Sequence, residues 1–363
     1  MRERRKIVKS KAGSKFIGDL PIGCKLCYEG AKAVIFITGI CYEKCYYCPI
    51  SVSRRNKDVI FVNNKKVKET NDILEELYAM KALGASITGG EPLIFPSRVI
   101  DLIKNLKDTF GEEFHIHLYT IGKQASKELI LKLYNVGLDE IRFHVINYSL
   151  LRKVKYAVQN TGMDVGIEVP VVPGSIEFYK KLIKQAEKYG VKFVNLNELE
   201  ISEGNYKALL ERNMRLRENR IAAVQGSEEE ALKILNWATY NTTQINIHYC
   251  SALFKDIIQT RRRFLRKALN IAKAYEKVSR EGLVLRGLLE TSVERKNTVF
   301  NLIREIPSEY SIENSKLIVY LPVEKLKIIS DKLKSRNIPF KAFVIEEYPE
   351  KTRTVKNIIP LYI

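Results

Sequence analysis

The sequence predicts an α/β protein in which a partial or nearly closed barrel of parallel strands is followed by a small α+β domain. Between residues 33 and 249, short apolar segments alternate with amphipathic segments of helical length, which is typical of repeated βα units. The alternation continues for six or seven units, which suits such a barrel. The 363 residues suffice for one large domain and one small domain.

The barrel strands are predicted from the short apolar runs, and the helices from the amphipathic segments between them. Chemistry in βα barrels lies at the carboxyl ends of the strands, so the loops that follow the strands are where a site is expected. The predicted strands lie near residues 33–38, 84–88, 114–119, 140–145, 164–169, 191–196 and 244–249, and the predicted helices include 71–82, 97–110, 126–136, 149–160 and 176–189.

Four segments are expected along the chain. They are a basic N-terminal part (1–30), the barrel core (31–200), a helical insertion with an extra strand and a basic helix (201–281), and the small α+β domain (282–363).

Helix caps and further elements are predicted after the barrel core. Ser227 is expected to cap a helix that starts with three glutamates, and Ser251 to cap a basic helix. After residue 282, the pattern predicts strands 283–289, 316–320, 339–346 and 354–361 and helices 292–304 and 322–335.

Cys41, Cys45 and Cys48 form a C-x3-C-x2-C triplet in the loop after the first predicted strand. Three thiolates at this spacing can bind three irons of a [4Fe–4S] cluster, which usually takes four cysteines. The fourth iron would then be open to a small molecule. A structural zinc site needs four ligands, and no fourth Cys or His lies nearby in the sequence, so the spacing favours the cluster.

The second predicted strand runs into Thr88-Gly89-Gly90-Glu91-Pro92. The two glycines allow the backbone to approach a ligand closely, and Glu91 offers an acceptor for an ammonium group. Together with the cysteine triplet, this segment resembles the radical SAM superfamily over roughly residues 31–200. The resemblance implies a (βα)6 partial barrel in which S-adenosylmethionine (SAM) chelates the open iron and the Gly-Gly-Glu-Pro segment binds its amino group. The whole sequence resembles an archaeal-type group likened to pyruvate formate-lyase activating enzymes.

The resemblance implies further SAM contacts at the ends of the strands. Tyr47 matches the aromatic residue that commonly precedes the third cysteine. His117 and Tyr119, with His115, alternate onto one face of the third strand, and the sequence leaves open whether this face contacts SAM or substrate or is a polar barrel rim. The fourth strand resembles one that supplies a polar residue to SAM, and the fifth resembles one that contacts adenine. The candidates on these two strands are Arg142, His144, Glu168 and Val169.

Three further cysteines are not used by the triplet. Cys24 and Cys27 form a C-x2-C pair, and Cys250 shares a strand face with His248. Three interpretations stay open at this point. The three thiols bind a second iron–sulfur cluster, or they form a Cys3His zinc site with His248, or the C-x2-C pair is a redox or chance pair and Cys250 acts alone.

The net charge of +19 predicts attraction to polyanions such as RNA or DNA. Basic residues are concentrated in residues 1–15 and 251–280, the latter with Arg261-Arg262-Arg263 and Arg266-Lys267. A single basic run is usually a solvated face, but two runs in a strongly basic chain favour a nucleic-acid partner.

Composition also bears on the cellular compartment. The sequence shows no signal peptide and no apolar run long enough to span a bilayer, so a cytoplasmic protein without a membrane partner is expected. Six cysteines in a cytoplasmic chain point to metal or redox chemistry and exclude a disulfide framework.

The expected activity follows from the resemblance. It implies that a reductant or electron-transfer protein supplies an electron to the cluster, and that SAM is cleaved to a 5′-deoxyadenosyl radical, which takes a hydrogen atom from the substrate. The charge favours RNA, either tRNA or rRNA, as the substrate. The alternatives are activation of a protein, as in glycyl-radical activases, and maturation of a peptide or small molecule. A non-enzyme alternative, a zinc-bearing RNA-binding protein, leaves residues 88–92 unexplained.

Overall fold

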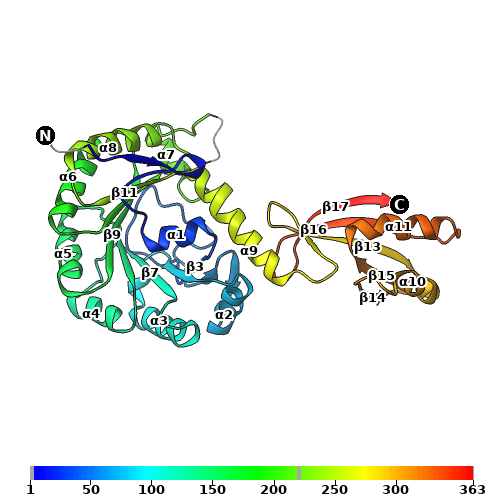
Figure 1. Cartoon of the computed structure of the whole chain (residues 1–363). Coiled ribbons are helices and arrows are strands. Elements are labelled where there is room, and N and C mark those ends of the chain that lie inside the picture. The colour runs from blue at the N-terminus through cyan, green and yellow to red at the C-terminus, as the bar shows by residue number, and fades with distance from the viewer. Residues whose placement is uncertain (1–3, 219–221, 363) are drawn as a thin grey trace. The chain divides into compact units, whose positions relative to one another are not determined.

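The computed structural model describes residues 4–218 and 222–362, which divide into two compact units (Figure 1). The first unit comprises residues 1–78 and 82–260, and the second comprises residues 79–81 and 261–363. Residues 1–3 of the predicted basic segment, 219–221 of the predicted insertion and residue 363 lie outside the described residues. The predicted division into four segments stays a prediction.

The first unit is a partial barrel, as the sequence predicts (Figure 1). Its sheet has eleven strands in the order β1-β2-β11-β10-β9-β8-β7-β6-β3-β4-β5. The strands from β11 to β3 in this order run parallel to their neighbours and correspond to the seven predicted strands. They are β3 (Lys32–Phe36), β6 (Gly84–Thr88), β7 (His115–Thr120), β8 (Glu140–Phe143), β9 (Asp164–Val171), β10 (Phe193–Glu198) and β11 (Asn246–Cys250).

Two short hairpins cover the open edges of this sheet. β4 (Ile60–Val62) and β5 (Lys65–Val67) extend it beside β3, and β1 (Ile7–Lys9) and β2 (Lys15–Ile17) extend it beside β11. All four strands have three residues each, too few to show an alternating pattern in the sequence, and the sequence analysis missed them. They pair antiparallel and so protect the edges of the parallel sheet.

Helices cover the outer face of the barrel (Figure 1). α8 lies in the predicted insertion but packs against α6 and against β9, β10 and β11, so it continues the outer layer. The prediction that Ser227 caps α8 is wrong: its hydroxyl donates to Val171 O and accepts from Leu199 N, which fastens the helix to the strand ends. The helices of this unit outside the barrel are α2 (Thr70–Ala79), α3 (Pro96–Phe110), α4 (Lys127–Asn135), α5 (Leu151–Asn160), α6 (Ile176–Lys188), α7 (Tyr206–Leu210) and α8 (Ser227–Asn241).

A short helix that the sequence analysis missed, α1 (Ile22–Tyr28), lies inside the ring of strands (Figure 1). It contacts β3, β6 and β7. Its close packing depends on Gly23, because a Cβ atom there would come within 2.6 Å of His117 Nδ1 and 2.7 Å of Arg142 Nη2. α1 therefore fills part of the barrel interior that side chains alone would otherwise have to fill.

A π-helix (Phe254–Thr260) follows β11 and ends the first unit. Ser251 Oγ accepts a hydrogen bond of 3.1 Å from Phe254 N, which confirms that Ser251 caps the helical segment. The second unit begins with the basic helix α9 (Arg261–Ile271). In α9, Arg263 and Lys267 are buried, and Arg266 donates to the carbonyls of Met80 and Lys81. This helix is therefore less available to an RNA backbone than its sequence predicts.

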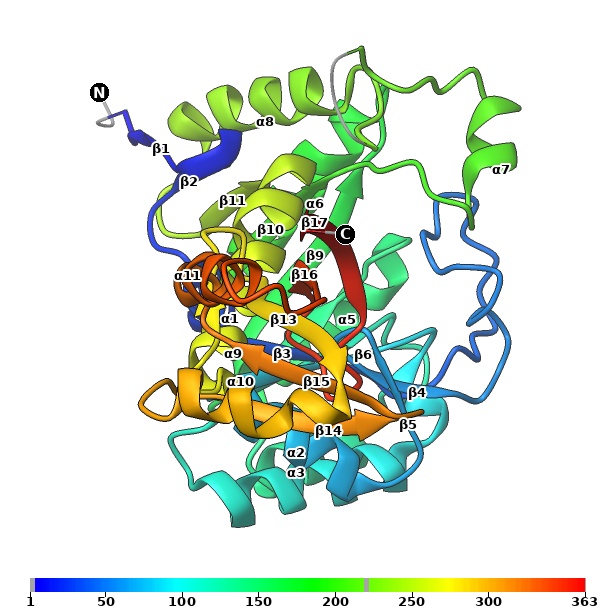
Figure 2. The same ribbon diagram turned by 90° about the vertical axis from the view of Figure 1, so that its right-hand side faces the viewer.

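The rest of the second unit is an α+β domain (Figure 2), as predicted, with two additional strands, β12 and β14. The strands pair antiparallel in the order β14-β15-β13-β16-β17, and β12 also pairs with β13. Apolar residues of both helices pack on one face of this sheet. The elements are β12 (Lys277–Val278), β13 (Val284–Ser292), α10 (Lys296–Ile303), β14 (Glu309–Glu313), β15 (Lys316–Leu321), α11 (Val323–Lys334), β16 (Lys341–Glu347) and β17 (Val355–Tyr362).

Candidate cluster and cofactor site

The two predicted motifs meet at the carboxyl ends of two neighbouring parallel strands. Phe36, the last residue of β3, pairs with Thr88, the last residue of β6. Beyond the strands, Gly90 N donates to Thr38 O over 2.8 Å and Glu91 N donates to Ile40 O over 2.9 Å. Backbone hydrogen bonds therefore join the segment 88–92 directly to the start of the cysteine loop.

Glycines make this contact possible. A Cβ atom on Gly89 would lie 2.4 Å from Thr38 O, and one on Gly90 would lie 2.4 Å from Ile40 O. Any side chain at either position would separate the two loops. The glycines thus approach the backbone that leads to Cys41, and their predicted approach to a ligand stays a prediction.

Glu91 is held in place by hydrogen bonds to the end of β7. Its side chain is buried, and its carboxylate accepts hydrogen bonds from Leu93 N (3.0 Å), Thr120 Oγ1 (2.7 Å) and Ile121 N (2.7 Å). Burial raises the pKa of Glu91, and these three donors oppose the rise. The carboxylate thus fastens the segment 88–92 to the end of β7, and its predicted contact with an ammonium group stays a prediction. Pro92, which follows it, starts a short 3-10 turn (Pro92–Ile94) and is buried.

The cysteine triplet lies in an irregular loop, and all three thiols are partly exposed. Cys48 N donates to Cys45 O over 3.1 Å, which closes a turn between these two residues, and Glu43 N lies 3.4 Å from Cys41 Sγ. Burial raises the pKa of the Cys41 and Cys45 thiols, so loading a cluster has to displace their protons. Three accessible sulfurs on one irregular loop suit a cluster that binds each of them through a different iron.

Tyr47 and His144 come together beside the triplet, although 97 residues separate them. Tyr47 Oη lies 3.0 Å from His144 Nε2, and His144 Nδ1 lies 3.1 Å from the carbonyl oxygen of Glu168. Because a carbonyl can only accept, Nδ1 carries the proton and Nε2 accepts from the Tyr47 hydroxyl. Asn205 Nδ2 donates to Tyr47 O over 3.0 Å and so anchors the cysteine loop from the α7 side, a contact that no sequence pattern indicated.

Arg142 lies at the centre of a buried charged network inside the barrel. Its guanidinium donates to Glu140, to Glu168 Oε2 over 2.7 Å and to Tyr119 Oη over 3.3 Å. Glu168 also accepts hydrogen bonds from Asn195 and Asn197, both over 2.9 Å. Arg142 and Glu168 neutralise each other's charge in this network, and their predicted contacts with SAM stay predictions. Val169, predicted to contact adenine, is a buried core residue.

His115, His117 and Tyr119 share one face of β7, as predicted. The ring centres of His115 and His117 are 5.8 Å apart, and those of His117 and Tyr119 are 5.1 Å apart. His117 is fully buried, and burial together with the charge of Lys32 holds its pKa well below the usual value. It is therefore a neutral imidazole whose Nε2 accepts from Lys32 Nζ, 3.4 Å away. This face points into the barrel, where α1 covers it.

The buried network makes a testable contribution to stability. Burial alone would raise the pKa of Glu140, but the charges of Arg142 and His115 outweigh it and lower the pKa from 4.5 to about 2. A lowered folded-state pKa stabilises the protein above pH 4.5, and this stabilisation is lost as the pH falls towards 2. Denaturant unfolding of the cluster-free protein should show a loss of about 3 kcal/mol across this range. Glu140→Gln should flatten the profile, and parallel profiles for the two proteins would contradict this origin.

Cys24, Cys27 and Cys250 come close enough for their charges to interact. Cys24 Sγ lies 3.6 Å from Arg142 Nη2 and 3.4 Å from Asn195 Nδ2, so its sulfur already has two donors. Burial raises the pKa of Cys250. His248 is buried, burial lowers its pKa to about 4, and neither ring nitrogen has a hydrogen-bond partner within residues 4–218 and 222–362.

The second-cluster, zinc and redox-pair interpretations of these four residues stay predictions. Because the Cys24 sulfur already accepts from two donors, we expect anaerobically reconstituted protein to bind metal at the triplet alone and to hold about four iron atoms per chain and no zinc. Elemental analysis measures both. About eight iron atoms per chain would instead support a second cluster at Cys24, Cys27 and Cys250.

Comparison with known proteins agrees with the two motifs. A sequence profile described as "Radical SAM superfamily" matches residues 35–197. A protein of Methanocaldococcus jannaschii named "Putative glycyl-radical enzyme activating enzyme" is 35% identical over 357 residues, which cover 94% of this chain and 93% of that protein.

Solved structures show weaker likeness. Streptococcus suis SuiB bound to the precursor peptide SuiA is 14% identical, with a TM-score of 0.45, over 64% of this chain and 53% of that one. Methylornithine synthase is 14% identical, with a TM-score of 0.41, over 59% of this chain and 63% of that one. The chain thus spans less than two thirds of either protein. Because the relative from M. jannaschii matches nearly end to end, this chain belongs to the radical SAM superfamily and is an enzyme that uses a [4Fe–4S] cluster and SAM.

Proposed function

We propose that this enzyme activates a partner protein by removing a hydrogen atom from the Cα of a glycine in the partner's backbone. The observation that carries the proposal is the extent of the likeness to the activating-enzyme relative. It covers 94% of the chain and therefore includes the second unit, far beyond the residues 35–197 that the whole superfamily shares. The radical chemistry that all members of the superfamily share does not require this chain and the relative to be similar in the second unit as well.

In this proposal, Cys41, Cys45 and Cys48 hold the cluster, and the segment 88–92 holds the methionine end of SAM. Hydrogen bonds from Leu93, Thr120 and Ile121 fix the Glu91 carboxylate, which offers acceptors to the amino group together with the backbone carbonyls of Gly89 and Gly90. When bound, the cluster and SAM supply a one-electron reductive cleavage that yields the hydrogen-abstracting radical.

The remaining residues orient these groups and exclude water. The hydrogen bonds from Gly90 and Glu91 to residues 38 and 40 fix the distance between the two loops. The Tyr47–His144 pair holds the aromatic ring in place beside the cysteines. Below them, the Arg142 network and α1 fill part of the barrel interior and so leave less room for water there.

The predicted RNA substrate has less support than this alternative. The comparisons favour a protein or peptide substrate, and the basic helix α9 has Arg263 and Lys267 buried. Membership of an enzyme superfamily removes the reason for the non-enzyme alternative. Concerning membrane partners, no helix within residues 4–218 and 222–362 is long and apolar enough to cross a bilayer.

The origin of the abstracted hydrogen tests the proposal. The source organism is grown once with [2,2-²H2]glycine and once with ribose-deuterated nucleosides. Its protein fraction or its RNA is then incubated anaerobically with the enzyme, unlabelled SAM and dithionite. We expect mass spectrometry to find deuterium in the 5′-deoxyadenosine only with glycine-labelled protein.

Each other outcome contradicts a specific part of the proposal. Deuterium that comes from RNA would restore RNA modification as the activity. Unlabelled 5′-deoxyadenosine from glycine-labelled protein would exclude glycine as the site of abstraction. Absence of 5′-deoxyadenosine from an enzyme with its full iron content would contradict the assignment of the SAM site.

A further inference from the structure

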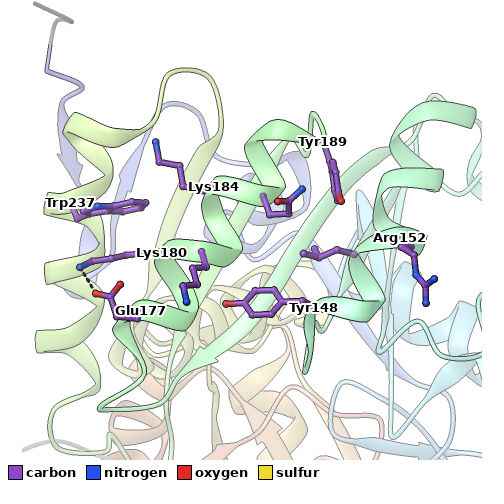
Figure 3. A pocket seen from close by; sticks show the side chains of 10 residues that line it. Tyr148, Arg152, Glu177, Lys180, Lys184, Tyr189 and Trp237 are labelled. Carbon is purple, nitrogen blue, oxygen red and sulfur yellow. Dashed lines mark hydrogen bonds and ion pairs between the residues drawn. The ribbon is translucent and has the colours of Figure 1, made fainter.

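An open groove of about 740 Å³ runs over the outer face of the barrel helices (Figure 3). α6 forms its floor with Glu177, Lys180, Lys181 and Lys184, and Trp237 of α8 stands on one side. Side chains of α5 and the residues next to it form the other side. This groove is built from the helix layer, whereas the cysteine loop follows the carboxyl end of a barrel strand, so the two sites are separate.

The groove combines positive charge with aromatic rings. Its lining holds four basic side chains and one acidic one, Glu177, which pairs with Lys180 over 2.7 Å. Three aromatic residues share the lining: Tyr148, Tyr189 and Trp237. Tyr148 is 41% exposed. The net charge of the lining is therefore positive, and its apolar surface is largely aromatic.

Two of the aromatic rings of the groove each have a lysine beside them. Lys184 Nζ lies 5.7 Å from the centre of the Trp237 ring, and Lys155 Nζ lies 5.3 Å from the centre of the Tyr189 ring. A base that stacked on either ring would bring its phosphate within reach of a lysine. A groove that follows a charged backbone and offers ring faces to bases is the usual construction of single-strand nucleic-acid sites.

We propose that this groove binds a single-stranded nucleic acid, with bases stacked on Trp237, Tyr189 and Tyr148 and phosphates held by Arg152, Lys181 and Lys184. An acidic peptide would use the charges but would offer no flat base to stack on the three rings. The groove is a binding site additional to the radical chemistry, and it gives the strongly basic chain a specific surface for a polyanion.

The chain carries its own probe for this site, because Trp237 is its only tryptophan. Titration of the whole protein with oligo(U) and oligo(dT) should quench the tryptophan fluorescence to saturation. Binding of a fluorescent oligo(U), measured by anisotropy, should weaken steeply with salt. Comparison of the RNA and DNA oligomers shows whether the 2′-hydroxyl contributes.

Two sets of variants separate stacking from charge. Trp237→Ala should weaken oligo(U) binding about tenfold, and Trp237→Phe should retain most of it. The triple variant Arg152→Gln/Lys181→Gln/Lys184→Gln should lower the slope of log K against log salt by about 2, at roughly 0.7 per lost phosphate contact. The control is the triple variant Lys66→Gln/Lys104→Gln/Lys132→Gln, which removes the same charge from exposed positions elsewhere on the first unit. It should leave the slope unchanged.

Three results would overturn the proposal. One is oligo(U) affinity that is equal in the groove triple variant and in the control. Another is poly-glutamate that competes as well as oligo(U) of equal charge, since that would make the groove a site for acidic protein. The third is a duplex that binds as tightly as the single strand, since paired bases cannot stack on the rings. Thermal melting of each variant shows that lost binding is not lost folding.

Discussion

Replacing Cys45 with alanine is expected to abolish SAM cleavage, with 5′-deoxyadenosine falling to the background of the protein-free reaction. Cys45 lies in the turn closed by the bond from Cys48 N to its carbonyl, between the two other cysteines of the loop. Without its sulfur, the cluster keeps two of three protein ligands and a second iron loses its protein ligand. Chromatography of anaerobic reactions with dithionite measures the product, and iron analysis measures the cluster.

Cys250→Ala is the matched control, because it also removes one partly exposed cysteine from the same unit. It should retain four iron atoms and the wild-type rate of 5′-deoxyadenosine formation. A Cys45→Ala variant that still cleaves SAM would contradict the assignment of the triplet. Equal loss in both variants would show that Cys250 belongs to the same machinery.

Replacing Arg142 with methionine is expected to destabilise the protein by about 3–5 kcal/mol. Methionine fills much of the space but leaves Glu140 and Glu168 without their shared cation in the barrel interior. Two adjacent carboxylates with little access to water then repel each other, which is costly in a medium of low dielectric constant. Denaturant unfolding of the cluster-free protein measures the loss.

The control restores neutrality. The triple variant Arg142→Met/Glu140→Gln/Glu168→Gln also removes the two carboxylate charges that lose their cation, so much of the lost stability should return. If the triple variant is as unstable as Arg142→Met, the packing of the guanidinium against Gly23 and Phe193 matters more than its charge.

The parallel strands could be predicted from the sequence because each is a short apolar run followed by an amphipathic helix. The same criterion missed α1, whose seven residues Ile22–Tyr28 are too few for a clear helical period. It also missed the hairpins at the sheet edges, where three-residue strands depend on pairing with β3 and β11. What the sequence could not show is structure that forms only through distant partners.

At the candidate site, too, contiguous motifs could be predicted and contacts between distant residues could not. The two motifs could be recognised because each is contiguous, and strand order placed them side by side. The hydrogen bonds of the Glu91 carboxylate could not be predicted, because its partners Thr120 and Ile121 lie at and just after the end of the next strand. The resemblance predicts SAM contacts for Arg142 and Glu168, but nothing in the sequence indicates that these two strand residues, 26 positions apart, face each other inside a barrel.

The pairing of β2 with β11 has a consequence for the order of folding. The hydrogen bond between Ser14 and Ser251 joins residues 237 positions apart, so the first strands made must wait for the last strand of the barrel. Closing such a long loop is slow, and the edge of β2 stays unpaired until then. Newly made chains should therefore pass through a state in which the remaining barrel strands have formed and the N-terminal hairpin is still undocked.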